Sequence, residues 1–301
     1  MNTDTNLKIL VCCHKKTNLP NDTQDILLPI QVGASKSKIN LGFQKDDTLF
    51  GNSCDNISEK NNIYCELTAM YWAWKNIKIL YPEISYIGLC HYRRFFFVKR
   101  NILREIARYF ISVLKPSLKL FLGQINHSNY IFTTEYVSNF KDNILEESNK
   151  IIKKIASNYD IITTIPIKFV DTDVRDFFNV IGRAYINLTE RIVKEFFGEY
   201  YEALENVLSG NKLSCANMFI CKVEMLDEYC SFIFGVLEKH IELVKQENLC
   251  INPEKEGIYS RVSGYLAEFL TYTYIVKKNR DGAKIKYLNK VFINNSDTEL
   301  F

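Results

Sequence analysis

The chain has 301 residues, of which 47% are hydrophobic and 24% are charged, as in most soluble globular proteins. Its formal net charge of +3 is too small to indicate a nucleic-acid partner. The polar first residues predict no signal peptide, and no apolar run reaches the roughly 18 residues that a membrane span needs. Nine cysteines without a CxxC pair favour reduced thiols and a cytoplasmic location.

The first third of the chain predicts alternating strands and helices. The expected elements are, in order, a buried strand over 7–13, an extended piece over 28–33, a polar loop over 35–61, a helix over 63–80 and a strand over 86–89. The helix should end at Tyr81, because the following proline disfavours helical geometry in the residue before it. This alternation is typical of an α/β fold.

The segment that follows the strand over 86–89 is the most informative part of the sequence. The strand ends abruptly in His91, Tyr92, Arg93 and Arg94, and apolar residues resume at Phe95. In open α/β sheets ligands bind at the carboxyl ends of strands. Two adjacent arginines placed there can hold a phosphate group in bidentate geometry. A charged surface turn is the alternative interpretation.

Residues 101–115 predict a helix with one apolar face and one basic face. Between Lys99 and Lys119 there are six cations and one acid. Such a helix can lie on an anionic membrane surface, whereas an ordinary surface helix would turn the same cations to water.

The rest of the chain predicts further helices and strands. They are a helix over 146–156, a strand over 160–165, a helix over 181–200, a short strand over 217–221, a long helix from residue 226 and a last helix over 259–275. Since no repeats or clear linkers interrupt them, we expect one domain over residues 1–301, with the basic helix at 101–115 inside it.

Motifs that would identify a common enzyme class are absent from the sequence. No HExxH, GxSxG, GxGxxG or GxxxxGK[ST] pattern occurs, which argues against metalloprotease, hydrolase, Rossmann and P-loop functions. The only Asp-x-Asp spacing is Asp171 to Asp173. It can bind Mg²⁺ together with the phosphates of a nucleotide, although two aspartates in a polar turn are more often solvated.

Two helices carry isolated polar groups among apolar ones. On the last helix Arg261, Tyr265 and Glu268 share one arc, with Gly264 beside it, which fits either the wall of a site or a solvent-facing stripe. Glu66 lies near the start of the first long helix in a largely uncharged stretch. The helix dipole favours a carboxylate there, and a buried one would need partners.

Six blocks of sequence match the pattern of one bacterial family over nearly the whole chain. They are Gln31–Ala34, Asp55–Asn61, Tyr64–Asn76, Ile87–Arg94, Asn217–Ile220 and Arg261–Glu268. On these blocks the sequence resembles the family catalogued as domain of unknown function 4422, whose members are similar to glycosyltransferases of capsule, exopolysaccharide and O-antigen gene clusters. One departure is visible: the family pattern continues with arginine where this chain has Phe269.

The resemblance implies a fold and an activity. The fold is a GT-A-like, nucleotide-sugar-binding α/β/α sandwich with a mostly parallel central sheet and additional helices in the C-terminal half. The activity is transfer of a hexose from a UDP-sugar to a lipid-linked saccharide acceptor in surface polysaccharide biosynthesis. Family analogy points to galactose, in pyranose or furanose form. The basic helix would then rest on the inner membrane face, and we expect a cytoplasmic, peripheral location.

The same resemblance gives the arginines a role. In most enzymes of that fold an Asp-x-Asp at the end of a central strand holds a divalent metal on the diphosphate. Here the equivalent strand ends in His91, Arg93 and Arg94, which we expect at the diphosphate. Our hypothesis is that the two arginines replace the metal, so that no metal or other cofactor is required.

The remaining candidate residues fall into three groups. Those expected at the nucleotide are His14, Lys15, Gln31, Val32, Gly33, Ala34, Asp55, Asn56 and Asn61. Those expected at the sugar or acceptor are Glu66, Asn217, Arg261 and Tyr265. An inverting transfer needs a carboxylate base, for which Glu268 is the first candidate and Asp173 the second.

Two other classes of function stay open at this point. A non-catalytic carbohydrate-binding or scaffolding subunit of the same assembly would keep the fold and need no acid or base. A nucleotidyltransferase would need a metal-binding acid pair, for which Asp171 and Asp173 offer a weak candidate.

Overall fold

The computed structural model describes residues 5–17, 19–98, 129–249 and 261–294, with the side chains of 129–144 and 294 left out. Its strands are β1 (Leu7–Cys13), β2 (Leu27–Gln31), β3 (Gln44–Lys45), β4 (Thr48–Leu49), β5 (Asn52–Ser53), β6 (Tyr86–His91), β7 (Arg94–Phe97), β8 (Asn129–Thr133), β9 (Ile161–Thr164), β10 (Ile167–Lys168), β11 (Lys212–Leu213), β12 (Phe219–Lys222) and β13 (Ile285–Asn294). Its helices are α1 (Asn61–Tyr64), α2 (Leu67–Leu80), α5 (Thr134–Ala156), α6 (Val174–Phe177), α7 (Arg183–Phe196), α8 (Tyr201–Leu208), α9 (Leu226–Gln246) and α11 (Val262–Arg280). Short 3-10 turns join several of them.

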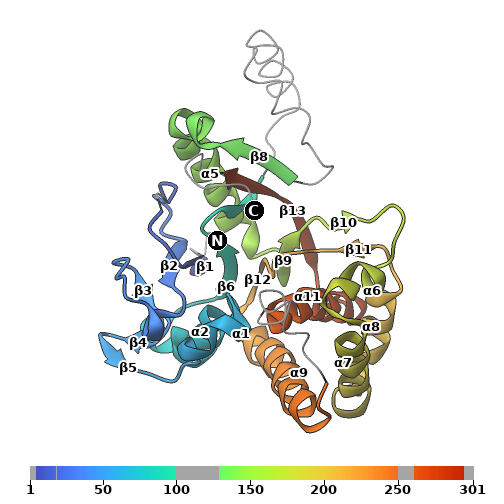
Figure 1. Ribbon diagram of the computed structural model, residues 1–301. Coiled ribbons are helices and arrows are strands. Elements are labelled where there is room, and N and C mark those ends of the chain that lie inside the picture. The colour runs from blue at the N-terminus through green and yellow to red at the C-terminus, as the bar shows by residue number, and fades with distance from the viewer. Residues whose placement is uncertain (1–4, 18, 99–128, 250–260, 295–301) are drawn as a thin grey trace.

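The central sheet is mixed (Figure 1). Strands β3, β2, β1 and β6 run parallel to one another. Strand β12 is antiparallel to both β6 and β9, and β13 is parallel to β9 and β8 but antiparallel to β7. The expectation of a mostly parallel sheet therefore holds only for its N-terminal half. Short apolar runs do not encode strand direction, because the same residues suit either pairing.

Two layers of helices cover the sheet. Helix α5 packs on one face through Leu145, Ile152 and Ala156. The other face carries α2, α9 and α11, with α7 and α8 behind them in the same apolar cluster. Along β1 the side chains alternate between the two faces of the sheet. Val11 and Cys13 pack on the face covered by α5, and Leu10 and Cys12 pack on the face covered by α2, α9 and α11. The expected α/β/α layering follows from this alternation.

The described elements differ from the prediction in several places, such as short strands inside the expected loop over 35–61, and two of the differences bear on the site. The helix expected over 63–80 is broken: α1 ends at Tyr64, and Cys65 has φ 52° before α2 begins. Strands β7, β8 and β13 were not expected at all. In β13 the cations Lys286 and Lys290 interrupt the apolar pattern, which hides a strand that lies in the middle of the sheet.

Gly88 marks the closest approach of β6 and β12. A Cβ at this position would lie 2.6 Å from Cγ1 of Ile220 and 2.9 Å from the carbonyl oxygen of Phe219. We expect Gly88→Ala to lower the free energy of unfolding by roughly 1–3 kcal/mol, because backbone atoms cannot move aside as a flexible side chain can. Urea denaturation measures this change. Gly198→Ala, where nothing lies within 4 Å of the new Cβ, is the control, and equal losses in both variants would contradict the prediction.

The basic helix expected at 101–115 lies outside the described residues. Among the helices that the structure does describe, none is long and apolar enough to cross a membrane.

Candidate functional site

The carboxyl ends of three parallel strands meet at one edge of the sheet. His14 and Lys15 follow β1, Val32 follows β2, and β6 ends at His91. The backbone N–H of Val32 donates to the carbonyl of Cys13 at 2.9 Å, which holds the first two strand ends together. Polar side chains from distant parts of the sequence are thereby gathered where ligands of open α/β sheets bind.

A tight turn between β6 and β7 presents the two arginines. His91 pairs with Arg94 across it, and Tyr92 and Arg93 form its tip. Both guanidinium carbons lie over the ring of Phe292, at 5.3 and 5.4 Å from its centroid, and that of Arg93 lies 5.0 Å from the centroid of Tyr92. Such a cation–π contact holds a guanidinium group near the ring without using its N–H donors.

These arginines have unused hydrogen-bonding capacity. Within the described part of the chain neither forms an ion pair with a carboxylate, and the buried Nε of Arg93 has no hydrogen-bond partner. Lys15 lies 5.8 Å from the Tyr92 ring, and His14 contacts the same ring edge-on at 5.0 Å. The pKa of His14 is lowered by burial and by the nearby charges of Lys15 and Arg93. The turn therefore carries an excess of positive charge that suits an anion.

Glu268 supplies a titratable carboxyl beside this positive region. Burial, followed by the charge of Glu66, raises the pKa of Glu268 to about 7. The N–H of Ala216 donates to the carboxylate, and the charges of Lys290 and Arg94 also act against the rise. A carboxyl with such a pKa can accept or release a proton near neutral pH. Most side chains of α11 are buried, whereas Arg261, just before the helix, is exposed and Tyr265 and Glu268 are half-buried.

Glu66 and His91 lie in the same cluster and have fixed partners. Glu66 immediately precedes α2, and its Oε1 accepts a 2.8 Å hydrogen bond from Nδ2 of Asn217. Nε2 of His91 lies 2.7 Å from the carbonyl oxygen of Ala216, to which it donates. Burial is the main cause that lowers the pKa of His91. A neutral ring bonded to the backbone does not neutralise a diphosphate, so the expected diphosphate role rests on the arginines.

The residues expected at the nucleotide shape the loops around these strand ends. The N–H groups of Gly33 and Ala34 donate to the carboxylate of the fully buried Asp46, at 2.8 and 3.0 Å. The side chain of Gln31 donates to the carbonyl of Ile39 at 2.7 Å. These polar groups already have partners within the protein, and their nucleotide-binding role stays a prediction.

The expected residues between β5 and α2 are engaged in the same way. Asn56 donates to the carbonyl of Cys54 at 2.7 Å, and Asn61 donates to the carbonyl of Cys65 at 2.6 Å. The exposed Asp55 accepts a 3.3 Å hydrogen bond from the hydroxyl of Tyr71. Asn61 packs against Gly33, where a Cβ would lie 2.9 Å from its Oδ1. The structure thus brings the 31–34 and 55–61 blocks together around the ends of β2.

The beginning of α11 lies against the break between α1 and α2. Nε of Arg261 donates to Sγ of Cys65 at 3.5 Å, and the absence of a side chain at Gly264 lets that sulfur approach. Tyr265 is half-buried on the same helix. Phe269, which stands where the family has arginine, is fully buried and packs on Phe178 with centroids 5.4 Å apart. It therefore faces the core and not the site.

Asp173 lies in a different place from the other candidates. Its carboxylate accepts a 2.7 Å hydrogen bond from the N–H of Asp176 and caps α6. Figure 1 shows α6 beside α8, on the far side of α11 from β6. Among the described residues no group of three or more His, Cys, Asp or Glu side chains could hold a metal ion. We assign Asp173 the capping role and do not carry it into the proposal below.

Lys290 is the residue of this cluster that sequence reasoning missed. It lies on β13, is 8% exposed, and its charge acts on Glu268. Burial lowers its pKa, while Glu268 acts in the opposite direction. The sequence signal for Lys290 was a lysine inside a run of apolar residues. Such a lysine indicates a buried functional group only once the run is known to be a strand.

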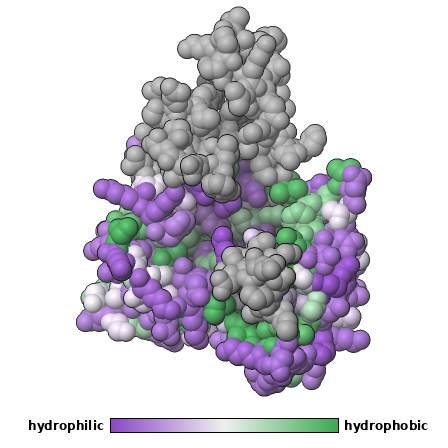
Figure 2. Space-filling view, viewed as in Figure 1, coloured by the Kyte–Doolittle hydropathy of each residue, from purple (hydrophilic) through white to green (hydrophobic). Residues whose placement is uncertain are grey.

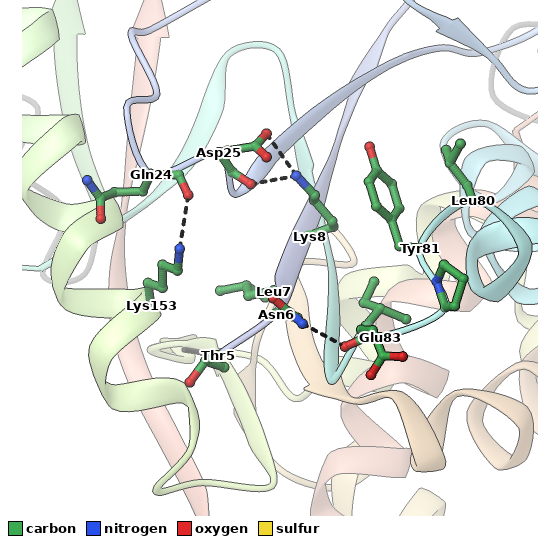
Figure 3. A pocket seen from close by; sticks show the side chains of 12 residues that line it. Thr5, Asn6, Leu7, Lys8, Gln24, Asp25, Leu80, Tyr81, Glu83 and Lys153 are labelled. Atoms are coloured by element: carbon green, nitrogen blue, oxygen red, sulfur yellow. Dashed lines mark hydrogen bonds and ion pairs between the residues drawn. The ribbon is translucent and has the colours of Figure 1, made fainter. Parts of the chain in front are cut away.

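The surface of the described residues has a recess (Figure 2) and, elsewhere, a cavity. In the view of Figure 1, the surface has a recess near its middle, between the N-terminal strands and the C-terminal helices. Hydrophilic residues line part of this recess (Figure 2). A cavity of about 430 Å³ lies elsewhere, at the amino ends of β1 and β6 (Figure 3). There Lys8 pairs with Asp25 at 2.8 Å, and Asn6 donates to the carbonyl of Glu83 at 3.0 Å. Its polar groups satisfy one another, so we do not place the chemistry there.

Comparisons with known proteins agree with this architecture. The chain is similar to the solved apo structure of WbbM, described as a bifunctional glycosyltransferase, with a TM-score of 0.72 and 24% identity over 99% of this chain and 48% of that one. The chain thus spans about half the length of that protein and shares its fold. No curated protein matches. The profile of the family described as "Domain of unknown function (DUF4422)" matches residues 8–279, and the chain belongs to that family. The resemblance drawn from the sequence blocks is confirmed.

Proposed function

We propose that this protein is a glycosyltransferase of GT-A-like fold that uses a nucleotide-diphosphate sugar as donor. The observation that carries the proposal is the pair Arg93 and Arg94, which lie over the ring of Phe292 at a strand end, have no carboxylate partner among the described residues, and lie near a carboxyl group, Glu268, whose pKa is about 7. An anion site and a proton acceptor are the two parts that such a transfer needs. The shared fold with a described glycosyltransferase supports it.

The proposed reaction assigns one task to each part of the cluster. The acceptor hydroxyl attacks the anomeric carbon of the donor sugar, and the bond from that carbon to the diphosphate oxygen breaks. The proton of the hydroxyl passes to the carboxylate of Glu268. The nucleoside diphosphate leaves with the bonding electrons, and the arginines stabilise the charge that develops on it.

The donor and acceptor are proposed by class. By analogy with the family's expected role, we propose a UDP-hexose, galactose in pyranose or furanose form, and a lipid-linked saccharide of a bacterial surface polysaccharide. Incubation of the purified protein with UDP-sugars and saccharide acceptors, followed by mass spectrometry of the products, tests this. Transfer supports the proposal, and binding of saccharide without transfer or hydrolysis of any sugar nucleotide would favour a non-catalytic subunit.

Transfer is expected to proceed without a divalent cation. In our proposal Arg93 and Arg94, which lie close to aromatic rings at the turn, neutralise the diphosphate in place of a metal. We therefore expect the rate of transfer in EDTA to equal the rate in buffer containing Mg²⁺ or Mn²⁺. A complete loss in EDTA that Mn²⁺ restores would overturn the assignment of the arginines.

Two substitutions should move the pH dependence of transfer in opposite directions. Because Glu268 must be ionised to accept a proton, kcat/KM should fall as the pH drops through about 7. Glu66→Gln removes a charge that raises the pKa of Glu268, so this acidic limb should move to lower pH. Lys290→Met removes a charge that lowers the same pKa, so the limb should move to higher pH.

The pH profiles of kcat/KM for the wild type and both variants measure these shifts. Lys239→Met, in an exposed pair with Glu242 on α9, serves as the control and should keep the wild-type profile. If the acidic limbs of the two variants' kcat/KM profiles shift in the same direction, or do not shift in either variant, Glu268 is ruled out as the titrating base.

A further inference from the structure

A chain of buried hydrogen bonds leads from the core to the Glu66 carboxylate. The hydroxyls of Tyr229 and Thr271 lie 2.9 Å apart, and Oγ1 of Thr271 donates to Oδ1 of Asn217 at 3.1 Å. Nδ2 of Asn217 then donates to Oε1 of Glu66 at 2.8 Å. Tyr229, Thr271 and Asn217 are at most 2% exposed. The chain joins α9, α11, the segment before β12 and the start of α2.

The direction of these bonds fixes which end of the Asn217 amide faces Glu66. A hydroxyl that donates to Oδ1 leaves the NH₂ group at the opposite end of the side chain. The two hydrogens of that group face Glu66 and the carbonyl of Gly264, at 2.8 and 3.4 Å. A flipped amide would place an oxygen against the carboxylate and the Gly264 carbonyl, so these acceptors exclude it, and the hydroxyl of Thr271 stabilises the orientation that donates to Glu66.

The backbone at this point is held in a conformation that side chains rarely adopt. Ala216 has φ 74° and Asn217 has φ 51°. Positive φ is tolerated by asparagine but costs free energy at alanine, and such strain persists only where the surroundings impose it. Ala216 uses this conformation to bond both His91 and Glu268. Ala216 and Asn217 together therefore bond three groups of the site, which are His91, Glu268 and Glu66.

We propose that Tyr229, Thr271 and Asn217 form a buried positioning chain that fixes the orientation of the Glu66 carboxylate at the site. All three are buried, and Asn217 acts through Glu66. The kinetic consequence rests on the proposed function, whereas the fixed orientation does not. A small error in the position of such a group is expensive in catalysis, since a displacement of about 1 Å can cost up to 10²-fold in rate.

Variants of Thr271 test the chain without emptying the core. Thr271→Val keeps the shape of the side chain and removes the hydroxyl that orients Asn217, whereas Thr271→Ser keeps the hydroxyl. Thr273→Val is the matched control, because Thr273 lies on the same helix, is fully buried, and its hydroxyl donates to the carbonyl of Phe269 at 2.8 Å and not to the chain. We expect kcat to fall about tenfold in Thr271→Val with a nearly unchanged donor KM, and to be retained in the other two variants.

The side-chain amide of Asn217 gives a readout that needs no activity. In ¹⁵N-labelled protein, one of its two protons should be shifted downfield by the bond to a carboxylate. Glu66→Gln should move that proton upfield, Thr271→Val should alter the signal, and Thr271→Ser should preserve it. If the Asn217 amide signal is unchanged in both Glu66→Gln and Thr271→Val, the proposal is overturned. An equal loss of kcat in Thr271→Val and Thr273→Val would also overturn it.

The two proposals can fail separately. A wild-type protein that transfers no sugar from any nucleotide would refute the proposed function, and the amide signals would still decide whether the chain orients Glu66.

Discussion

Glu268→Gln should abolish most of the transfer activity, with kcat lowered by roughly 10²–10⁴-fold, the range that a positioned acid or base contributes. Glutamine keeps the shape of the side chain and the hydrogen bond from Ala216, but it cannot take the proton of the acceptor hydroxyl. Steady-state kinetics measure the loss, and donor KM should change little, because the base acts on the acceptor. Glu242→Gln, on the exposed face of α9, is the control. Full turnover in Glu268→Gln would remove this residue from the role.

The same variant should change how stability depends on pH. The pKa of Glu268 in the folded protein, about 7, lies above its ordinary value of 4.5. Protonation therefore favours the folded state: the contribution of Glu268 is complete below the ordinary pKa and is lost as the pH rises through about 7. Between these values the melting temperature of the wild type should fall relative to that of Glu268→Gln. If the melting temperatures of the two proteins change with pH in parallel, the pKa of Glu268 is not raised. This result does not depend on any assay of transfer.

Alanine at Arg93 or Arg94 should lower kcat by roughly 10²–10³-fold, the loss seen when a group that stabilises developing charge is removed. Each guanidinium lies over the ring of Phe292 without a carboxylate partner among the described residues, so its donors are available to the proposed diphosphate. Lysine at either position should restore only part of the rate. It keeps the charge but lacks the planar, bidentate group.

Kinetics with the donor, and binding of the free nucleoside diphosphate by calorimetry, measure this effect. Arg191→Ala, which breaks an exposed ion pair with Glu247 on the far helices, is the control for loss of positive charge. If both alanine variants bind the nucleoside diphosphate as tightly as the control, the anion site lies elsewhere.

The turn with the two arginines could be located from sequence because its signal is local. An apolar strand that ends in His91, Tyr92, Arg93 and Arg94 needs no knowledge of distant residues. Glu66, Asn217 and Glu268 were named as separate candidates, and the structure joins them through the Asn217–Glu66 bond and the field of Glu66 on Glu268. Their proximity depends on how α2, α11 and β12 pack, which periodicity does not encode.

The features of the sheet that the sequence did not predict have separate physical causes. Strand β13 was missed because its lysines break the alternation that marks a strand, and Lys290 was missed with it. The direction of β12 could not be predicted because four residues suit either pairing. The role of residues 31–34 and 55–61 at a nucleotide stays a prediction. In the structure Gly33 and Ala34 bond to Asp46, and Asn61 bonds to the carbonyl of Cys65. A polar loop residue that serves its own backbone is indistinguishable in sequence from one that serves a ligand.

The position of β13 has a consequence for how the protein assembles. This strand comes after every other element of the described sheet in sequence, yet it lies between β9 and β7 and brings Lys290 and Phe292 to the site. The pairing of β9 with β7 through β13 cannot form, and the arginines lack the ring of Phe292, until these late residues have been synthesised and inserted. Pairings between such distant segments form slowly. Competence to bind the donor should therefore appear as one of the last events of folding, after the β1, β2 and β6 core has formed.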